Sequence, residues 1–281
     1  MNIVISAENT IDLPKELLDK YNIHVIPFNV TLGDQTSNSY TTAEIFDYVD
    51  KTGILPKTSA VNEVEYGEHF DGLLKDYDAI IHFAIGSGIS STIDNAKRVA
   101  SERNNCYIVD TQSLSTGIAL LAIYASKLVE KGLNAKEIYD KVNARIPYVQ
   151  ASFVIERLDY LYKGGRCSGL ALFGANLLKI RPQIQIKNGK MQPTRKYRGR
   201  MEDVFRKNCE DTLAEFNNPD KSIGFVTYTS ASDEMVKIGI DALKNAGFET
   251  VYNTFAGSTI GSHCGRNTIG ILYINDGGQE D

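Results

Sequence analysis

The sequence predicts an α/β protein of two domains: a three-layer N-terminal domain around a parallel sheet and a mixed-sheet α/β C-terminal domain. The chain has 281 residues, and an average domain has about 150. Strand-like and helix-like segments alternate from the N-terminus, an order that favours parallel strands covered by helices. After Pro147 an Asn-Gly turn between two alternating segments predicts an antiparallel hairpin. We therefore expect domains over residues 1–150 and 151–281.

The N-terminal half begins with a short apolar strand over residues 2–6. Asp12-Leu13-Pro14 then offers a capping residue and an early proline for a helix over 14–21. Pro27 indicates an edge or a bulge in a strand over 23–30. The other predicted elements are helices at 41–51 (capped by Thr42), 64–77, 92–103, 114–132 and 134–145 (capped by Asn134), and strands at 78–84 and 105–109.

The C-terminal half contains more strands and more glycine. A short helix over 158–162 breaks at Gly164-Gly165, and residues 170–179 form an apolar segment. Residues 258–268 are dotted with glycine and are expected to form a loop. The other predicted elements are strands at 151–155, 183–187, 190–195, 222–228, 248–253 and 268–274, and helices at 201–216 and 233–246.

Composition argues against several classes of protein. A formal net charge of −5 argues against a nucleic-acid partner bound by phosphate neutralisation. No segment approaches the roughly 18 apolar residues of a membrane span, and the N-terminus lacks the features of a signal peptide. The four cysteines form no C-x-x-C pair, and no His-Glu-x-x-His or calcium-loop motif occurs. We expect a cytoplasmic protein with reduced thiols, no metal site and no stable membrane insertion.

Three loops follow strands or short helices at positions where α/β sheets bind ligands: 55–60, 85–92 and 110–117. The 85–92 loop combines glycines and hydroxyls before a helix whose N-terminus favours an anion. It lacks the lysine of a phosphate-binding P-loop. The alternative is that Ser90 or Ser91 caps the helix, and that Thr58 or Ser59 caps the helix near residue 62.

Histidine and arginine supply further candidates. His263 lies among small residues, where its imidazole could reach a ligand, whereas the other three histidines fall in predicted strands or a helix. We expect Cys264 to be structural. Arg166 follows the glycine break, and Arg198 and Arg200 flank Gly199 after the hairpin. Arginine suits bidentate contact with carboxylate or phosphate, and the alternative for the last two is a solvated basic turn.

Seven short motifs follow one another along the chain: Asp12-Leu13-Pro14, Pro56-Lys57-Thr58-Ser59, Ser87-Gly88-Ile89-Ser90-Ser91-Thr92, Val109-Asp110-Thr111 with Ser113, Ser115 and Gly117, Lys163-Gly164-Gly165-Arg166-Cys167-Ser168, Arg198-Gly199-Arg200 and His263-Cys264-Gly265. Taken together in this order, they resemble the DegV family of bacterial fatty acid-binding proteins over essentially the whole chain. The sequence departs from the family pattern at Ala7-Glu8-Asn9-Thr10, at Ser91, and at Cys264, Arg266 and Asn267.

The resemblance implies a lipid-binding carrier rather than an enzyme, with no cofactor. The carboxylate of a long-chain fatty acid such as palmitate, stearate or oleate would lie between the domains. By motif position Thr58, Ser90 and His263 would hydrogen-bond it, with Arg166 as electrostatic support. The acyl chain would run into a tunnel in the C-terminal domain that residues 170–178 could line. Some members of the family present the fatty acid to an ATP-dependent kinase that makes acyl phosphate, and Arg198 and Arg200 would then form a partner or phosphate surface.

The free energies expected for burying a fatty acid are consistent with a carrier. A buried carboxylate needs donors to replace water, and burying about 14 methylenes at roughly 0.8 kcal/mol each gives on the order of 11 kcal/mol before ordering costs. Two enzymatic alternatives remain open. His263 could act as a nucleophile or base on a small carbonyl compound, as in dihydroxyacetone kinases, which the chain also resembles in fold class. Ser90 or Cys264 could serve with His263 in a hydrolase.

Overall fold

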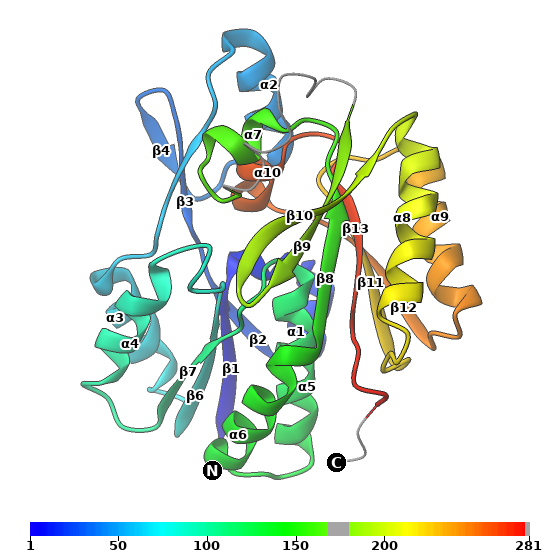
Figure 1. The fold of residues 1–281 in the computed structure, drawn as a ribbon. Coiled ribbons are helices and arrows are strands. Elements are labelled where there is room, and N and C mark those ends of the chain that lie inside the picture. The colour runs from blue at the N-terminus through cyan, green and yellow to red at the C-terminus, as the bar shows by residue number, and fades with distance from the viewer. Residues whose placement is uncertain (168–179, 279–281) are drawn as a thin grey trace.

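The computed structural model describes residues 1–167 and 180–278 and stacks helices and sheets in alternating layers (Figure 1). The first sheet has the order β2-β1-β6-β7, and all its strands are parallel. β1 and β6 are buried along their whole length, which is typical of a parallel sheet covered on both faces. Its strands are β1 (Ile3–Glu8), β2 (Ile23–Ile26), β6 (Ala79–Ala84) and β7 (Cys106–Asp110).

Helices cover both faces of this sheet, so the predicted three-layer arrangement is confirmed. One face carries α3 (Glu63–Leu73) and α4 (Thr92–Ala100), and the other carries α5 (Thr116–Glu130) and α6 (Ala135–Arg145). Asn134 caps α6 as predicted, in a capping box with Glu137. The short α1 (Lys15–Lys20) packs beside β2, and the 3-10 turns η1 (Asn9–Ile11) and η2 (Ile146–Tyr148) link neighbouring elements.

The second sheet has the order β10-β9-β8-β13-β11-β12 and is mixed, as predicted, because only β11 and β12 run parallel. Asn188 and Gly189 both have positive φ, 51° and 72°, which is the geometry an Asn-Gly hairpin turn requires. The elements are β8 (Val149–Val154), β9 (Arg181–Lys187), β10 (Lys190–Tyr197), α8 (Met201–Glu215), β11 (Ile223–Tyr228), α9 (Asp233–Asn245), β12 (Thr250–Phe255) and β13 (Ile269–Ile274).

The two sheets share a core through α5. α8 and α9 cover the outer face of the second sheet, while α5 contacts β1 and β6 of the first sheet and β8, β11 and β13 of the second. The helix is therefore buried on almost every side rather than on one stripe. One hydrophobic cluster runs from Ile3 to Ile274, so strands on both sides of residue 150 pack into the same core.

A third, three-stranded sheet was not predicted. The expected single strand over 23–30 divides at Pro27, which has no N–H for a ladder bond, and the following residues enter another sheet. This sheet has the order β4-β3-β5, with β3 (Asn29–Leu32) antiparallel to β4 (Gln35–Ser37) and to β5 (Lys57–Ser59), part of the expected 55–60 loop. α2 (Thr42–Thr52), α7 (Asp159–Lys163) and α10 (Ser258–Cys264) pack around it.

Three further expectations need correction. The cap of α2 is Thr41, in a capping box with Glu44, rather than Thr42. Pro14 rather than Asp12 precedes α1, and the Asp12 carboxylate accepts bonds from the Ser115 hydroxyl and the Gly257 N–H instead. Residues 258–264 form α10 rather than a loop. This helix of 7 residues is rich in glycine and hydroxyls, so tertiary contacts must supply what its helix propensity lacks.

The segment 170–178, expected to line an acyl tunnel, lies outside the described residues. Within the described residues, no helix combines the length and the apolar character that crossing a membrane requires.

Candidate functional site

Thr58, Ser90, Arg166 and His263 line one cavity of about 120 Å³, although they are far apart in the sequence. They come from β5, the loop before α4, the segment after α7, and α10. The small three-stranded sheet brings Thr58 and His263 together, because β5 pairs with β3 and α10 packs against both strands. Apolar side chains complete the wall: Phe28, Ala60, Ile85, Ile89, Met191 and Ile260.

Thr58 and His263 form the polar centre of the cavity. The Thr58 Oγ1 and His263 Nε2 atoms lie 2.8 Å apart, and the Nδ1 atom of His263 is buried with no hydrogen-bond partner in the described part of the chain. Burial, and secondly the positive charge of Arg166, lower the pKa of His263 to about 4. The imidazole is therefore neutral at pH 7 and has one N–H to donate.

Gly164 lets the imidazole sit where it does. A Cβ on Gly164 would come within 2.8 Å of His263 Nδ1 and of the Tyr160 carbonyl oxygen. The carbonyl oxygen of Gly164 accepts a hydrogen bond of 2.7 Å from Nη1 of Arg166. Arg166 is exposed and stands at the rim of the cavity. Glycine at 164 thus leaves room for the imidazole, while its backbone carbonyl, which any residue would supply, holds Arg166.

Two carboxylates anchor the loop that carries Ser90: the buried Glu8 and the half-buried Asp110. Glu8 Oε2 accepts from the Ile85 N–H at 2.6 Å, and Asp110 Oδ1 accepts from the Ser87 N–H at 3.0 Å. Burial raises the pKa of Glu8 to about 7, against hydrogen bonds from Tyr66, Ile85, Thr92 and Thr10 that lower it. Ser91 is the N-cap of α4 but its side chain makes no capping bond, whereas Ser90 Oγ accepts from the Thr92 N–H at 3.3 Å. Of the two serines, only Ser90 therefore bonds to the start of the helix, as the capping interpretation expected.

The tip of the β9–β10 hairpin packs against this loop at Gly88. A Cβ on Gly88 would overlap the carbonyl oxygen of Gly189. The second sheet thereby contacts the loop that carries Ser90, through the Gly189 backbone and the side chain of Lys190. The hairpin also brings Met191 to the cavity wall.

Replacing Gly88 with alanine should separate the hairpin from the loop. The new methyl group meets backbone, which cannot rotate away, so we expect a loss of about 1–3 kcal/mol in the free energy of unfolding, as in other overpacked sites. Urea denaturation measures it. Gly72→Ala in α3 is the matched control, because nothing lies within 4 Å of that position and alanine favours a helix. Equal stability of Gly88→Ala and wild type would contradict the close approach.

Sequence reasoning missed Thr259 and Asp12. Thr259 lines the cavity, and its Oγ1 atom is buried with no hydrogen-bond partner among the described residues. Thr259 and His263 are spaced i, i+4 in α10, so helical spacing within the assumed loop was the signal that could have found Thr259. Asp12 lies just after η1, and its carboxylate accepts hydrogen bonds from Ser115 before α5 and from Gly257 before α10. Burial raises the pKa of Asp12 to about 7.

The two remaining arginines lie apart from the cavity. Arg198 and Arg200 are exposed and do not line it. Arg200 pairs with Asp203, with Nε and Oδ2 3.1 Å apart, at the start of α8. The structure therefore joins four of the six sequence-predicted residues into one site and leaves these two on the surface.

A hydrolase would need a nucleophile hydrogen-bonded to the imidazole, and the described residues show no such pair. Within the described residues His263 Nε2 bonds to Thr58, and neither Ser90 nor Cys264 hydrogen-bonds to the imidazole. Burial raises the pKa of Cys264 to about 12, so its thiol stays protonated. The structure described here also groups no three His, Cys, Asp or Glu side chains in a way that could hold a metal ion.

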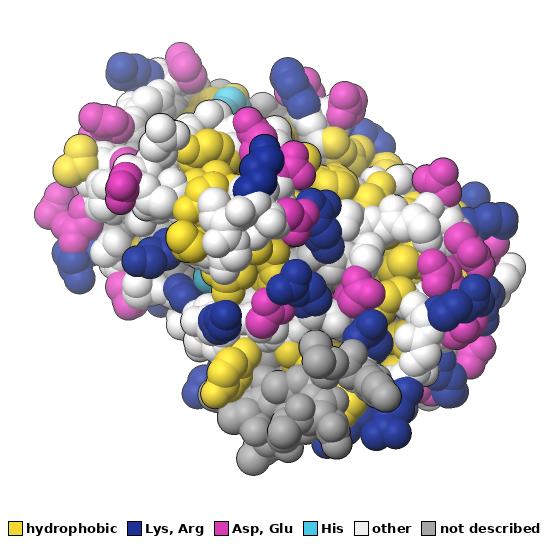
Figure 2. All heavy atoms as spheres, turned by 90° about the horizontal axis from the view of Figure 1, so that it is seen from above, with side chains coloured by type: hydrophobic (Ala, Val, Ile, Leu, Met, Phe, Trp, Pro, Cys, Tyr) yellow, Lys and Arg dark blue, Asp and Glu magenta, His cyan; other side chains and the backbone are white. Residues whose placement is uncertain are grey.

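α7, α10 and the small sheet lie at the upper end of Figure 1, the end that Figure 2 views from above. Hydrophobic side chains gather near the middle of this face, and charged side chains surround them (Figure 2). Tyr162 of α7 and Ile54 just after α2 are among the exposed large hydrophobic residues of the chain. The end of the molecule that holds α7 and α10 therefore exposes apolar as well as charged surface.

Comparisons with known proteins give a consistent assignment. The family model described as "Uncharacterised protein, DegV family" matches residues 2–276. The chain is 30% identical to a fatty acid-binding protein of Thermotoga maritima, over 96% of each chain. Its fold is similar to that of the fatty acid-binding DegV protein of Bacillus subtilis, with 26% identity, a TM-score of 0.85 and coverage of 98% and 100%. A DegV family protein of Thermus thermophilus, also described by its fatty acid binding, has a TM-score of 0.90 at 23% identity, with the same coverage, and shows the fold alone.

Proposed function

The chain belongs to the DegV family, and we propose that it binds a long-chain fatty acid such as palmitate, stearate or oleate. In this proposal the carboxylate occupies the cavity lined by Thr58, Ser90, Arg166 and His263. The observation that most supports it is the set of donors that meet there. The cavity brings together a neutral imidazole, a threonine hydroxyl bonded to it, and Thr259, whose hydroxyl has no hydrogen-bond partner among the described residues.

The neutral imidazole and the hydroxyls suit a carboxylate. When His263 donates its Nε2–H to Thr58 Oγ1, the Thr58 O–H proton is free to donate to a ligand oxygen. Hydrogen bonds to an ionised acceptor are about twice as strong as neutral ones. Ser90 and Thr259 offer further hydroxyls, and Arg166 places positive charge at the rim. A buried anion would thus find both donors and a nearby countercharge.

We propose that the acyl chain continues along Ile260 into the C-terminal domain of residues 151–281. The 120 Å³ cavity has room for about four water-sized groups, enough for a carboxylate and its first methylenes. A second, almost wholly apolar cavity of about 20 Å³ lies against the six-stranded sheet, with Phe153 and Leu272 in its wall. Both cavities border Ile260 and Cys264. In this proposal the acyl chain passes from one cavity to the other beside Ile260, which both have in their wall.

A carrier of this kind must transfer its ligand to another protein. We propose that the protein is a non-catalytic carrier in the cytoplasm that presents the carboxylate to an ATP-dependent fatty acid kinase. Arg166 at the rim supports this, because the carboxylate end of the ligand would lie nearest to solvent. The exposed Arg198 is a candidate contact for such a partner, while Arg200 already pairs with Asp203.

Ligand exchange with purified protein tests the binding proposal. The protein is delipidated, incubated with palmitate or with dihydroxyacetone, and analysed by native mass spectrometry. We expect one palmitate per chain and no adduct with dihydroxyacetone. A covalent dihydroxyacetone adduct on His263 without palmitate uptake would favour the carbonyl enzyme instead. Failure to take up palmitate, stearate or oleate would overturn the proposed function.

A further inference from the structure

α10 carries Thr259 and His263, which line the cavity, yet its sequence favours a helix only weakly. It has 7 residues, and its N-cap is Gly257, which has no side chain that could cap the first turn. The first N–H groups of a helix find no partner within the helix itself. Contacts from outside α10 must therefore fix where its first turn lies.

The peptide group that joins Ala256 to Gly257 leads into α10 and is held on both sides. Its carbonyl oxygen accepts a hydrogen bond of 2.9 Å from the Thr42 hydroxyl, and its N–H donates one of 2.8 Å to Asp12 Oδ1. Thr42 and Asp12 are buried, and they lie 214 and 245 residues from these partners along the chain. Both polar atoms of one peptide are thus bonded to side chains of the N-terminal half.

Thr42 contacts α10 at a second point, one turn further along that helix. A Cβ on Gly261 would lie 2.5 Å from the methyl carbon of Thr42, which is closer than side chains pack. The Gly261 N–H bonds to the Gly257 carbonyl oxygen within α10 at 2.9 Å. The first residue of α2 therefore packs directly against the first turn of α10.

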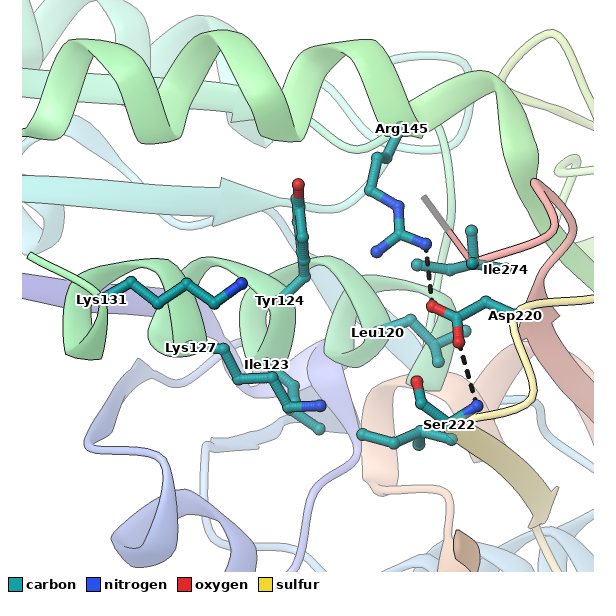
Figure 3. Close-up of a pocket in the computed structure, with 11 residues that line it drawn as sticks. Leu120, Ile123, Tyr124, Lys127, Lys131, Arg145, Asp220, Ser222 and Ile274 are labelled. Carbon is teal, nitrogen blue, oxygen red and sulfur yellow. Dashed lines mark hydrogen bonds and ion pairs between the residues drawn. The ribbon is translucent and has the colours of Figure 1, made fainter. Parts of the chain in front are cut away.

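Asp12 is fixed in turn by the start of α5. Its Oδ2 atom accepts a hydrogen bond of 2.5 Å from the hydroxyl of Ser115, the N-cap of α5. Ser115 has a φ of 53°, which L residues rarely adopt, so its surroundings impose this conformation. Toward its other end α5 borders a pocket of about 300 Å³, where Arg145 lies 4.4 Å from the Tyr124 ring centre and pairs with Asp220 (Figure 3). Asp12 thus connects α10 to a helix that is held at both ends.

We infer that Asp12 and Thr42 are positioning residues of the ligand site. By holding the peptide that precedes α10, they set where that helix places Thr259 and His263. The inference rests on the proposed function, because a fatty acid carboxylate is the group that would meet these two side chains. Neither Asp12 nor Thr42 lines the cavity, so a change at either should reach the ligand only through α10.

An ordinary capping role would produce the same two hydrogen bonds and would affect only stability. A positioning role also changes the affinity of the folded protein for its ligand. What favours positioning is that the peptide is held at both of its polar atoms, two residues before Thr259. Measuring stability and affinity on the same variants separates the two roles.

Isothermal titration of folded, delipidated variants with palmitate tests the inference, with urea denaturation in parallel. We expect Asp12→Ala to weaken palmitate binding by about ten-fold and Thr42→Val by about three-fold, because a hydrogen bond to a charged group is stronger than a neutral one. Asp12→Asn keeps an acceptor oxygen and Thr42→Ser keeps the hydroxyl, so both should retain affinity. Thr52→Val is the matched control, because it removes an exposed hydroxyl bond to the Tyr48 carbonyl within α2 and should bind as wild type does.

The amide proton of Gly257 gives a second readout by NMR. Burial raises the pKa of Asp12 to about 7, so the chemical shift of this proton should change through that pH in wild type and stay constant in Asp12→Asn. The Cys264 thiol, which the charge of Asp12 also affects, has a pKa of about 12 and stays protonated throughout. A constant shift in wild type would contradict the bond to Asp12.

The affinities decide the rest. The inference is overturned if folded Asp12→Ala and Thr42→Val bind palmitate as tightly as Thr52→Val, or if Asp12→Asn and Thr42→Ser lose as much affinity as the alanine and valine variants. Should Asp12→Ala fail to fold, Thr42→Val against Thr42→Ser decides alone. Failure of wild type itself to bind palmitate would contradict the proposed function, and this inference with it.

Discussion

Replacing Thr58 with valine should weaken the binding of palmitate to the delipidated protein by about 10- to 100-fold. Valine keeps the shape of the side chain and removes the hydroxyl that bonds to His263 at 2.8 Å. A buried donor lost without replacement costs about 1–3 kcal/mol, and each 1.4 kcal/mol is a factor of ten in affinity. Isothermal titration with palmitate measures the change. His263→Ala should act in the same direction, because it removes the group that orients Thr58.

Two neighbouring variants make this result specific. Thr58→Ser keeps the hydroxyl and should keep most of the affinity. Ser59→Ala removes a hydroxyl from the next residue of β5, which is exposed and whose side chain points to the other face of the strand. It should bind palmitate as wild type does. If Thr58→Val binds palmitate as tightly as Ser59→Ala, the carboxylate does not lie at Thr58.

Replacing Glu8 with glutamine should change how stability depends on pH. The pKa of Glu8 is about 7 in the folded protein and 4.5 in an ordinary environment, and the first cause is burial. The folded state therefore holds a proton that the unfolded chain releases between these values. The stability that this proton contributes is complete below pH 4.5 and is lost as pH rises through 7. Glutamine does not titrate, so wild type should lose about 3 kcal/mol relative to Glu8→Gln across this range.

The comparison must be made as a difference between the two proteins. His263 and His69 have pKa values lowered to about 4 by burial, so they add stability as pH rises from about 4 to 6.5 and mask part of the Glu8 effect in wild type alone. Glu44→Gln is the control, because hydrogen bonds from the Thr41 N–H and hydroxyl lower the pKa of that exposed carboxyl. Its pH dependence above pH 5 should follow wild type. Parallel curves for wild type and Glu8→Gln would contradict a raised pKa.

Much of the architecture could be predicted because local rules and tertiary structure agreed. Continuous apolar segments became the buried strands β1 and β6, and the Asn-Gly pair became the hairpin turn between β9 and β10. The order of strands and helices sufficed for the parallel first sheet. The predictions failed where contacts between residues far apart in the sequence determine the local secondary structure. The strand over 23–30 divides because its second part pairs with β5, and α10 forms because the residues around it hold a sequence of low helix propensity.

The sequence by itself determined the fold class, the family and which residue types carry the chemistry. Thr58, Ser90, Arg166 and His263 could each be named from their motifs, but each also had an ordinary structural explanation. Only the tertiary structure decided that these four share one cavity, that Arg198 and Arg200 do not line it, and that Thr259 belongs with them. The physical reason is that hydrogen bonding and burial depend on distances between segments up to 205 residues apart, as for Thr58 and His263. Periodicity and motifs report only the neighbours along the chain.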